Sequence, residues 1–224
     1  MGKNKLKHFA ENETFTNMFQ PSYEDLKQSY PMKGNWNKEF FKNSHPIVLE
    51  LGCGKGEYTV GLARRYPEKN FIGIDVKGAR MWRGCKTSIE EGLVNVAFIR
   101  SKIQLIEYLF DSNEISEIWI TFPDPQPRHA RMNQRLTSPR FLSKYAAIIS
   151  KDAVINLKTD NEPFFDYTLE VIQQEGHNLI EVVKNLYSAE GYDEVKAIRT
   201  YYEKKFNDLG FSIHYLRFKM NHEG

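Results

Sequence analysis

The chain has 224 residues and a formal net charge of +2 at neutral pH. This length suits one large domain or one domain with an extension, and 41% hydrophobic with 27% charged residues excludes a disordered chain. Two cysteines without a CxxC pattern exclude a disulfide scaffold and a zinc site, so we expect no bound metal. No run of about 20 apolar residues is present, so we expect no membrane partner.

Residues 1–44 show no sustained hydrophobic periodicity, and Pro21 and Pro31 interrupt them. We predict an N-terminal basic arm that is partly flexible, with one short helix near Trp36–Lys42. The first lysines are followed by acidic and polar residues and not by the apolar core of a signal peptide. We therefore expect a cytoplasmic protein.

Residues 45–224 are predicted to form one domain in which strands and helices alternate. The predicted strands are Ile47–Leu51, Phe71–Ile74, Val94–Ile99, Ile115–Phe122, Ala153–Leu157, His177–Val183 and Phe211–Lys219. The predicted helices, one after each of the first six strands, are Tyr58–Tyr66, Lys77–Glu91, Leu105–Phe110, Pro139–Ser150, Pro163–Glu175 and Glu194–Leu209. This alternation is typical of an α/β fold with a mostly parallel sheet and helices on both faces.

A glycine-rich turn follows the first predicted strand, and its sequence is Glu50-Leu-Gly52-Cys-Gly54-Lys-Gly56. Ligands of open α/β sheets bind at the carboxyl ends of the strands. Glycines let the backbone turn tightly and approach a ligand, and the next helix offers free N–H groups. The spacing is not the dinucleotide pattern G-x-G-x-x-G. It is typical of class I S-adenosylmethionine methyltransferases, although a simple strand–helix turn would also explain it.

Asp75 follows the second predicted strand, about 20 residues after the glycines. A carboxylate at this place can accept two hydrogen bonds from the hydroxyls of a ribose. An N-cap for the next helix is the structural alternative. The nicotinamide dinucleotide NAD remains a competing ligand for the glycines and Asp75 together.

The fourth predicted strand ends in a proline-rich loop that contains Asp124, in the sequence Phe122-Pro-Asp-Pro125. The prolines on both sides restrict the backbone. The loop lies across the sheet edge from the expected cofactor turn, where a methyl acceptor would be held. We therefore expect a functional carboxylate, with a structural Asp-Pro turn as the alternative.

Two basic elements are candidates for binding nucleic acid through its phosphates. Residues 125–151 contain no Asp or Glu but contain Arg128, His129, Arg131, Arg135, Arg140, Lys144 and Lys151. Residues 199–206 combine basic and aromatic side chains, and Thr200 and Glu203 would share one face of a helix there. A solvated basic surface is the alternative for the first element.

Taken together, these motifs resemble the tRNA (guanine-N7-)-methyltransferase family. The resemblance rests on Leu49–Gly56, Gly73–Val76, Phe122–Pro125, Leu157–Asp160 and the T-x-Y-E pattern at Thr200–Glu203 with Phe206, and it spans residues 47–218. It implies a Rossmann-like fold with a seven-stranded, mostly parallel sheet and an antiparallel edge strand. It also implies S-adenosylmethionine as methyl donor and tRNA as substrate.

The resemblance assigns residues to the cofactor and to the RNA. Glu50 would contact the methionine end of the cofactor, Asp75 its ribose, and the segment around Ser101 its adenine. The expected cofactor-binding set is Glu50, Gly52, Gly54, Gly56, Asp75, Ser101 and Asp124. Asp124 is also the expected catalytic residue, and the expected substrate-binding residues are Arg128, Asp160, Thr200, Tyr201, Tyr202 and Glu203.

The chain departs from the family pattern at several of these positions. Ser101 stands where Asp is common, which weakens the expected adenine contact. Gln126 stands where Trp is usual, and the basic run at Arg128–Arg135 is thinner than usual, which affects the expected affinity for RNA.

Guanine N7 carries a free lone pair, so methylation there requires no base to remove a proton first. A nearby carboxylate would stabilise the positive charge that develops on the base. We expect Asp124 in this role, with Asp160 as second candidate. A small-molecule methyltransferase, a non-catalytic RNA-binding module of the same fold and a nicotinamide oxidoreductase remain alternatives. The sequence leaves open whether the protein is a monomer or a homodimer.

Overall fold

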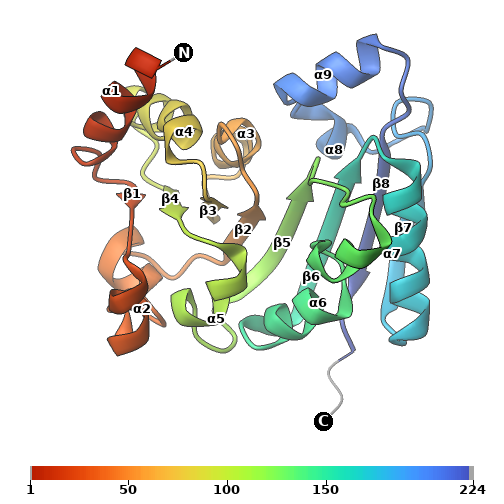
Figure 1. The fold of residues 1–224 in the computed structure, drawn as a ribbon, viewed down its shortest axis with the longest axis horizontal. Helices are drawn as coiled ribbons and strands as arrows, with labels where there is room; N and C mark the ends of the chain where they lie inside the picture. The colour runs from red at the N-terminus through yellow and green to blue at the C-terminus, as the bar shows by residue number, and fades with distance from the viewer. Residues whose placement is uncertain (1, 222–224) are drawn as a thin grey trace.

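A computed structural model describes residues 2–221 of the chain. Its centre is one eight-stranded sheet with the strand order β1-β4-β3-β2-β5-β6-β8-β7 (Figure 1). The strands are β1 (Met18–Phe19), β2 (Ile47–Leu51), β3 (Asn70–Asp75), β4 (Val96–Arg100), β5 (Ile115–Thr121), β6 (Ile149–Thr159), β7 (Asn178–Val183) and β8 (His214–Lys219). Strands β1 to β6 pair in parallel, whereas β8 runs antiparallel between β6 and the edge strand β7.

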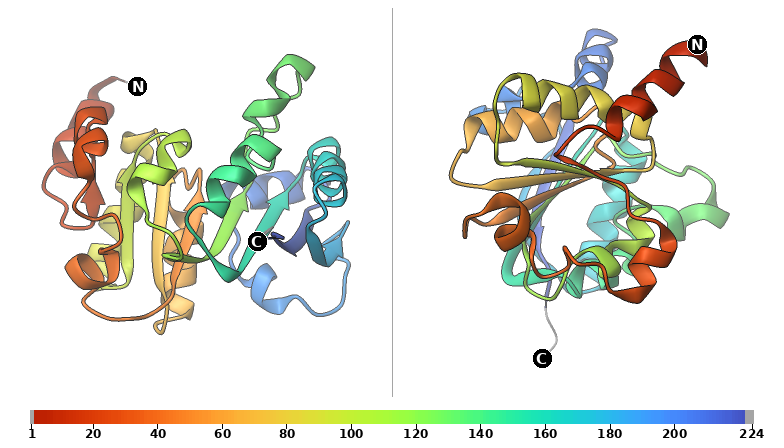
Figure 2. Two further views of the ribbon diagram at one scale, coloured as in Figure 1. Left: turned by 90° about the horizontal axis from the view of Figure 1, so that it is seen from below. Right: turned by 90° about the vertical axis from the view of Figure 1, so that its left-hand side faces the viewer.

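Helices cover both faces of this sheet (Figure 2). They are α1 (Gly2–Asn12), α2 (Tyr23–Ser29), α3 (Glu57–Arg65), α4 (Gly78–Glu90), α5 (Ile106–Leu109), α6 (Pro139–Ala146), α7 (Glu162–Gln174), α8 (Asp193–Ala197) and α9 (Tyr201–Asp208). Three further turns are the π-helix η1 (Trp36–Phe41) and the 3₁₀-helices η2 (Ile103–Leu105) and η3 (His129–Gln134). The predicted α/β class, with a mostly parallel sheet and helices on both faces, is confirmed.

The core consists of two apolar layers, one on each face of the sheet. In β2, Leu49 packs with α2, α5, α6 and α7, whereas Val48 packs with α3 and α4 on the other face. Alternate side chains of a strand point to opposite faces, so a strand buried on both sides is apolar throughout. This explains why the parallel strands appear in the sequence as short continuous apolar runs.

Residues 2–44 are built into this fold, and they supply the strand beyond the seven that the sequence predicts. β1 pairs with β4, and α1 packs on α4, where the Trp82 indole N–H donates to Glu11 over 2.6 Å. Trp36 is completely buried, and its indole N–H donates to the Leu109 carbonyl over 3.0 Å. These contacts join residues about 70 positions apart, so they cannot be predicted from local periodicity.

Two predicted helices differ from the structure. The helix predicted at Pro139–Ser150 ends at Ala146, and β6 begins at Ile149. The helix predicted at Glu194–Leu209 is wrong as a single helix, because it is divided into α8 and α9. Thr200 is extended and caps α9, since its hydroxyl accepts from the Glu203 N–H while the Glu203 carboxylate accepts from the Thr200 N–H. None of the helices in the described part of the chain is long and apolar enough to cross a membrane.

Candidate functional site

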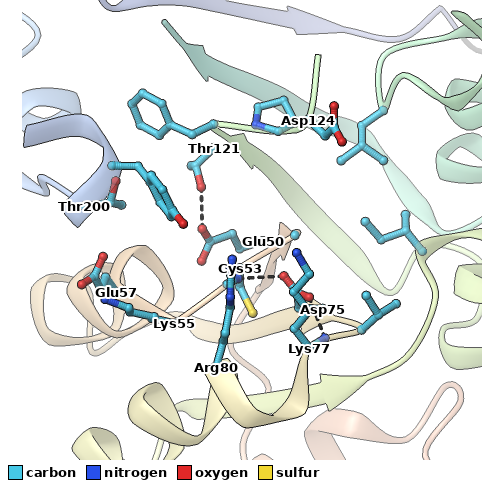
Figure 3. Close-up of a pocket in the computed structure, with 18 of the residues that line it drawn as sticks. Glu50, Cys53, Lys55, Glu57, Asp75, Lys77, Arg80, Thr121, Asp124 and Thr200 are labelled. Atoms are coloured by element: carbon cyan, nitrogen blue, oxygen red, sulfur yellow. Dashed lines mark hydrogen bonds between the residues drawn. The ribbon is translucent and has the colours of Figure 1, made fainter. Parts of the chain in front are cut away.

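A pocket of about 460 Å³ lies at the carboxyl ends of β2, β3 and β5 (Figure 3). Ligand pockets typically measure about 300–1,000 Å³, so this one can hold a nucleoside-sized molecule. It brings together residues that are predicted from four separate segments of the sequence, namely Glu50, Gly52, Gly54, Asp75, Ser101 and Asp124. Thr200 and Tyr202 line the same pocket from α9 and its cap.

The glycine turn lies along one wall of the pocket. Gly52, Gly54 and Gly56 have φ angles of +74°, +57° and +71°, which residues other than glycine rarely adopt. The space beside Gly52 is open, with no atom within 4 Å of an added Cβ. A Cβ on Gly56 would lie 2.5 Å from the Phe98 ring, and Gly56 does not line the pocket. Gly52 and Gly54 therefore remain candidates for ligand contact, whereas Gly56 serves helix packing.

Asp75 is held in place by the backbone at the end of β3. Its Oδ2 accepts from the Gly54 N–H over 3.0 Å, and its Oδ1 accepts from the Lys77 N–H over 2.8 Å. Each carboxylate oxygen has two lone pairs, so each can accept one more hydrogen bond. The carboxylate thus fixes the glycine turn and can still receive two ligand hydroxyls. It is not the N-cap of α4, because Lys77 holds that position and no side chain caps the helix.

Glu50 is buried at the floor of the pocket, with 3% of its surface exposed. Its Oε2 accepts from the Thr59 N–H over 2.9 Å and from the Thr59 hydroxyl, and its Oε1 accepts from the Thr121 hydroxyl over 2.6 Å. Burial raises the pKa of the Glu50 carboxyl to about 7, although these donors oppose the shift. A cationic ligand in the pocket would favour the ionised form.

Asp124 is exposed at the rim of the pocket, on the opposite side of Glu50 from Asp75 (Figure 3). Its Oδ1 accepts from the Gln126 N–H over 3.1 Å. Phe122 and Gln126 both have left-handed backbones, with φ of +48° and +46°. Asp124 therefore stabilises the turn with one carboxylate oxygen, and its other oxygen is left available to a ligand.

Ser101 lies at the end of β4 in the pocket wall, and its backbone N–H donates to the Asp75 carbonyl over 3.2 Å.

The structure places other predicted residues outside the pocket. Arg128 is exposed at the N-cap of η3, and Tyr201 is exposed on α9. Asp160 lines a different cavity together with His214 and does not line the pocket beside Asp124.

Glu203 is enclosed by the protein and has no exposed surface. Its Oε1 lies 2.7 Å from Lys158 Nζ and accepts from the Tyr187 hydroxyl over 2.7 Å. Lys158 is equally buried and also donates to the Val195 carbonyl over 2.9 Å. Direct contact between Glu203 and RNA does not fit this environment.

Some residues that line the pocket are missing from the sequence-based prediction. Lys55, Lys77 and Arg80 are exposed cations in its wall. Their positions beside the glycines and beside Asp75 are the signal that could have identified them. Within residues 2–221, no cluster of three or more His, Cys, Asp or Glu side chains is placed to hold a metal ion.

The acid-free segment after Asp124 has both structural and exposed cations. Arg135 donates to the Pro125 carbonyl over 3.2 Å and stacks on Tyr167 at 4.2 Å, so it braces the loop. Lys144 forms an ion pair with Glu107. The remaining cations of the segment, which are exposed, are Arg128, Arg131, Arg140 and Lys151.

Comparisons with known proteins agree with this geometry. The family model described as "Putative methyltransferase" matches residues 44–216. The chain is 55% identical to the tRNA (guanine-N(7)-)-methyltransferase of Christiangramia forsetii, over 97% of this chain and 98% of that protein. It is 46% identical to the protein of the same name from Bacteroides fragilis, over 100% of this chain and 88% of that protein.

Solved structures show the same fold at low sequence identity. The 16S rRNA methyltransferase KamB superposes with a TM-score of 0.62 at 15% identity, over 90% of this chain and 94% of that chain. A SAM-dependent methyltransferase from Aquifex aeolicus gives a TM-score of 0.53 at 15% identity, over 97% and 98%. At these identities the similarity concerns the fold alone.

Proposed function

The chain belongs to the tRNA (guanine-N(7)-)-methyltransferase family, and from this premise we propose that the pocket holds S-adenosylmethionine and that Asp124 faces the target guanine. The enzyme methylates N7 of a guanosine in tRNA, with S-adenosylmethionine as methyl donor. We place this guanosine in the variable loop of the tRNA, as the sequence resemblance implies. The observation that carries the assignment of the site is the convergence of Glu50, Asp75 and Asp124 on one pocket.

The residues of the pocket fit the proposed cofactor. Asp75 retains two lone pairs for the hydroxyls of a ribose, and its position is fixed by two backbone donors. Glu50 offers a buried carboxylate that an ammonium group would keep ionised. Ser101, which stands where the family commonly has Asp, offers a hydroxyl and a backbone carbonyl beside the place expected for the adenine. When bound, S-adenosylmethionine supplies an electrophilic methyl group.

We assign to Asp124 the stabilisation of the charge that develops on the guanine. N7 has a free lone pair, so alignment of the base supplies most of the catalysis and no proton has to leave first. The free oxygen of Asp124 can accept from the N1–H and N2–H edge of guanine, and its negative charge opposes the positive charge that forms. The flanking prolines and the Gln126 N–H hold this carboxylate in place.

We infer that Glu203 is a positioning residue and not an RNA contact. It caps α9 together with Thr200, and its pair with Lys158 joins α9 to the carboxyl end of β6. Thr200 and Tyr202 then face the pocket from this fixed helix end. Within Thr200–Glu203, the residues that we propose to touch the substrate are Tyr202 of the T-x-Y-E pattern and Tyr201 at its variable position.

We place the enzyme in the cytoplasm because its substrate is tRNA. The test of the function is incubation with unmodified tRNA and S-adenosylmethionine labelled in the methyl group. Borohydride reduction followed by aniline is expected to break the RNA strand at the labelled nucleotide, which is diagnostic of 7-methylguanosine. Label on a different atom, or no transfer to tRNA, would contradict the proposal.

A further inference from the structure

A second cavity, of about 840 Å³, lies beside the cofactor pocket. It forms a groove between α3, α4 and the residues that link α8 to α9. Lys55 and Glu57 line both the groove and the pocket, so the two are contiguous. The sequence analysis names residues 199–206 as a basic element, but neither it nor the proposed catalytic mechanism assigns a role to the cations of α3 and α4 that complete this groove.

The groove is strongly basic. Six cations and one carboxylate line it, and they are Lys55, Arg64, Arg65, Arg83, Arg199, Lys204 and Glu57. Arg64 and Arg83 form ion pairs with Glu91 and Glu90 on its outer side. Among residues 4–221, no carboxylate lies within ion-pairing distance of the other four cations. The groove therefore carries an excess of positive charge, which attracts an anion.

Two of these four cations are held over aromatic rings. The Lys55 ammonium lies 4.6 Å from the centre of the Tyr201 ring, and the Arg199 guanidinium lies 4.4 Å from the centre of the Tyr187 ring. The Glu57 carboxylate is occupied as well, because it accepts from the Tyr201 backbone N–H over 2.8 Å. The positions of the positive charges are thus partly fixed before any ligand arrives.

Two exposed aromatic side chains lie near these cations. Tyr202 lines the cofactor pocket, and the Tyr201 ring lies under Lys55, which lines both cavities. Tyr201 and Tyr202 are 54% and 41% exposed. Cations beside exposed aromatic rings are the arrangement by which proteins bind single-stranded nucleic acid, since phosphates meet the charges and unpaired bases stack on the rings. An acidic protein surface would use the cations but not the rings.

We propose that this groove binds the phosphates of the tRNA strand next to the target guanosine, an inference that rests on the proposed function. The strand would cross the mouth of the pocket from η3, whose Gln134 lines one wall, to Tyr202 on the other wall. It would continue into the groove along Arg65, Arg199 and Lys204. The exposed cations of residues 125–151 and those of the groove then bind the RNA on opposite sides of the reacting base.

The test is the double substitution Arg65→Ala and Lys204→Ala, because both side chains are exposed in the groove and neither lines the cofactor pocket. The Kd for unmodified tRNA is measured over a series of salt concentrations, and the affinity for S-adenosylmethionine is measured by calorimetry. We expect Kd for tRNA to rise about fivefold or more, and the slope of log K against log salt to become shallower by about 0.7–0.9 per lost phosphate contact. The affinity for S-adenosylmethionine and kcat at saturating tRNA are expected to stay within about twofold.

The matched control is Lys38→Ala with Lys42→Ala, which removes the same charge from η1 and its cap, on the segment that leads into the amino end of β2. This control is expected to keep the salt slope of the wild-type protein. Equal Kd and slope in the groove variant and the wild type would overturn the inference, and so would an equal loss in the control. If the wild type fails to methylate tRNA, the proposed function itself fails, which is a separate result.

A proximity experiment gives a second readout. Cys53 and Cys85 are buried, so Lys204→Cys introduces an accessible thiol for a reagent that cleaves nearby RNA backbone. Cleavage is expected within a few nucleotides of the methylated guanosine. Cleavage only at distant parts of the tRNA, or none in a complex that still forms, would contradict the proposed path of the strand.

Discussion

Lys158 Nζ lies 2.7 Å from Glu203 Oε1, and both side chains are completely inaccessible to solvent. The pair connects the carboxyl end of β6 with the first turn of α9, and Lys158 also binds the Val195 and Ile198 carbonyls of α8 and the linker after it. Burial lowers the pKa of Lys158, and the Glu203 carboxylate opposes this shift. The ion pair therefore holds the segment that presents Thr200 and Tyr202 to the pocket.

Glu203→Gln is expected to destabilise the protein and to weaken tRNA binding. The substitution leaves the Lys158 cation buried without its partner, which costs about 3–5 kcal/mol. The free energy of unfolding in urea measures this cost, and KM for tRNA is expected to rise more than kcat falls because the rim of the pocket loosens. The control is Glu162→Gln, whose carboxylate forms an exposed ion pair with Lys184 and should change stability by less than about 1 kcal/mol. If KM for tRNA stays unchanged in the destabilised but folded variant, the positioning role is wrong.

Asp124→Asn is expected to reduce kcat by about 100-fold while leaving the affinity for S-adenosylmethionine within about twofold. The amide oxygen of Asn can still accept from the Gln126 N–H, so the turn is kept and only the charge is lost. The steady-state rate with tRNA and the calorimetric Kd for the cofactor measure the two effects. Asp160→Asn is the control, because Asp160 lies outside the pocket. A larger loss of kcat in the Asp160 variant would show that Asp160, and not Asp124, stabilises the charge on the guanine.

The affinity for S-adenosylmethionine is expected to fall as the pH drops below about 7. The Glu50 carboxyl has a pKa of about 7, and the ammonium group of the cofactor favours its ionised form. Below this pH a proton must leave before the cofactor binds, so Kd should rise up to tenfold per pH unit. Calorimetry in buffers of different ionisation enthalpy measures the released proton. Glu50→Gln should bind more weakly and lose this pH dependence, and an unchanged pH profile in that variant would refute the assignment.

Glu50 also predicts how stability depends on pH. Its carboxyl pKa is raised in the folded protein from an ordinary value of 4.5, so the folded state binds the proton more tightly than the unfolded state. The protonated carboxyl contributes fully to the free energy of unfolding below pH 4.5. This contribution is lost as the pH rises to about 7, so the free energy of unfolding decreases by about 3 kcal/mol. Urea unfolding of the wild type and of Glu50→Gln between pH 5 and pH 8 isolates this contribution. The variant should gain stability relative to the wild type as the pH rises, and a constant difference would contradict the effect.

Two glycine substitutions in one turn should have different consequences. Gly56→Ala places a Cβ at 2.5 Å from the Phe98 ring, so thermal unfolding should show a loss of stability larger than that from backbone strain alone. Gly52→Ala meets no atom within 4 Å, and its cost is the left-handed backbone of about 1–2 kcal/mol. Because Gly52 lines the pocket, its substitution should weaken cofactor binding more than that of Gly56 in folded protein. The reverse order of cofactor affinities would show that our assignment of the two glycines is wrong.

The candidate site was largely predictable because its residues follow the strands in sequence. Glu50, Asp75 and Asp124 each stand at or just after the end of a parallel strand, and such ends meet at one edge of a sheet. Asp160 satisfies the same rule at the end of β6, yet it lines another cavity. The rule predicts the edge of the sheet but not the direction in which a side chain points.

The sequence by itself determined the alternation of strands and helices, the glycine turn and the family motifs, because periodicity and turn chemistry depend on neighbouring residues. Only the tertiary structure decided the pairing of β1 with β4, the burial of Glu203 against Lys158 and the basic groove that joins Arg65 to Lys204. These features bring together residues that are between 45 and about 140 positions apart in the chain. Which distant charges become partners depends on how the helices pack on the sheet, and no local pattern encodes that packing.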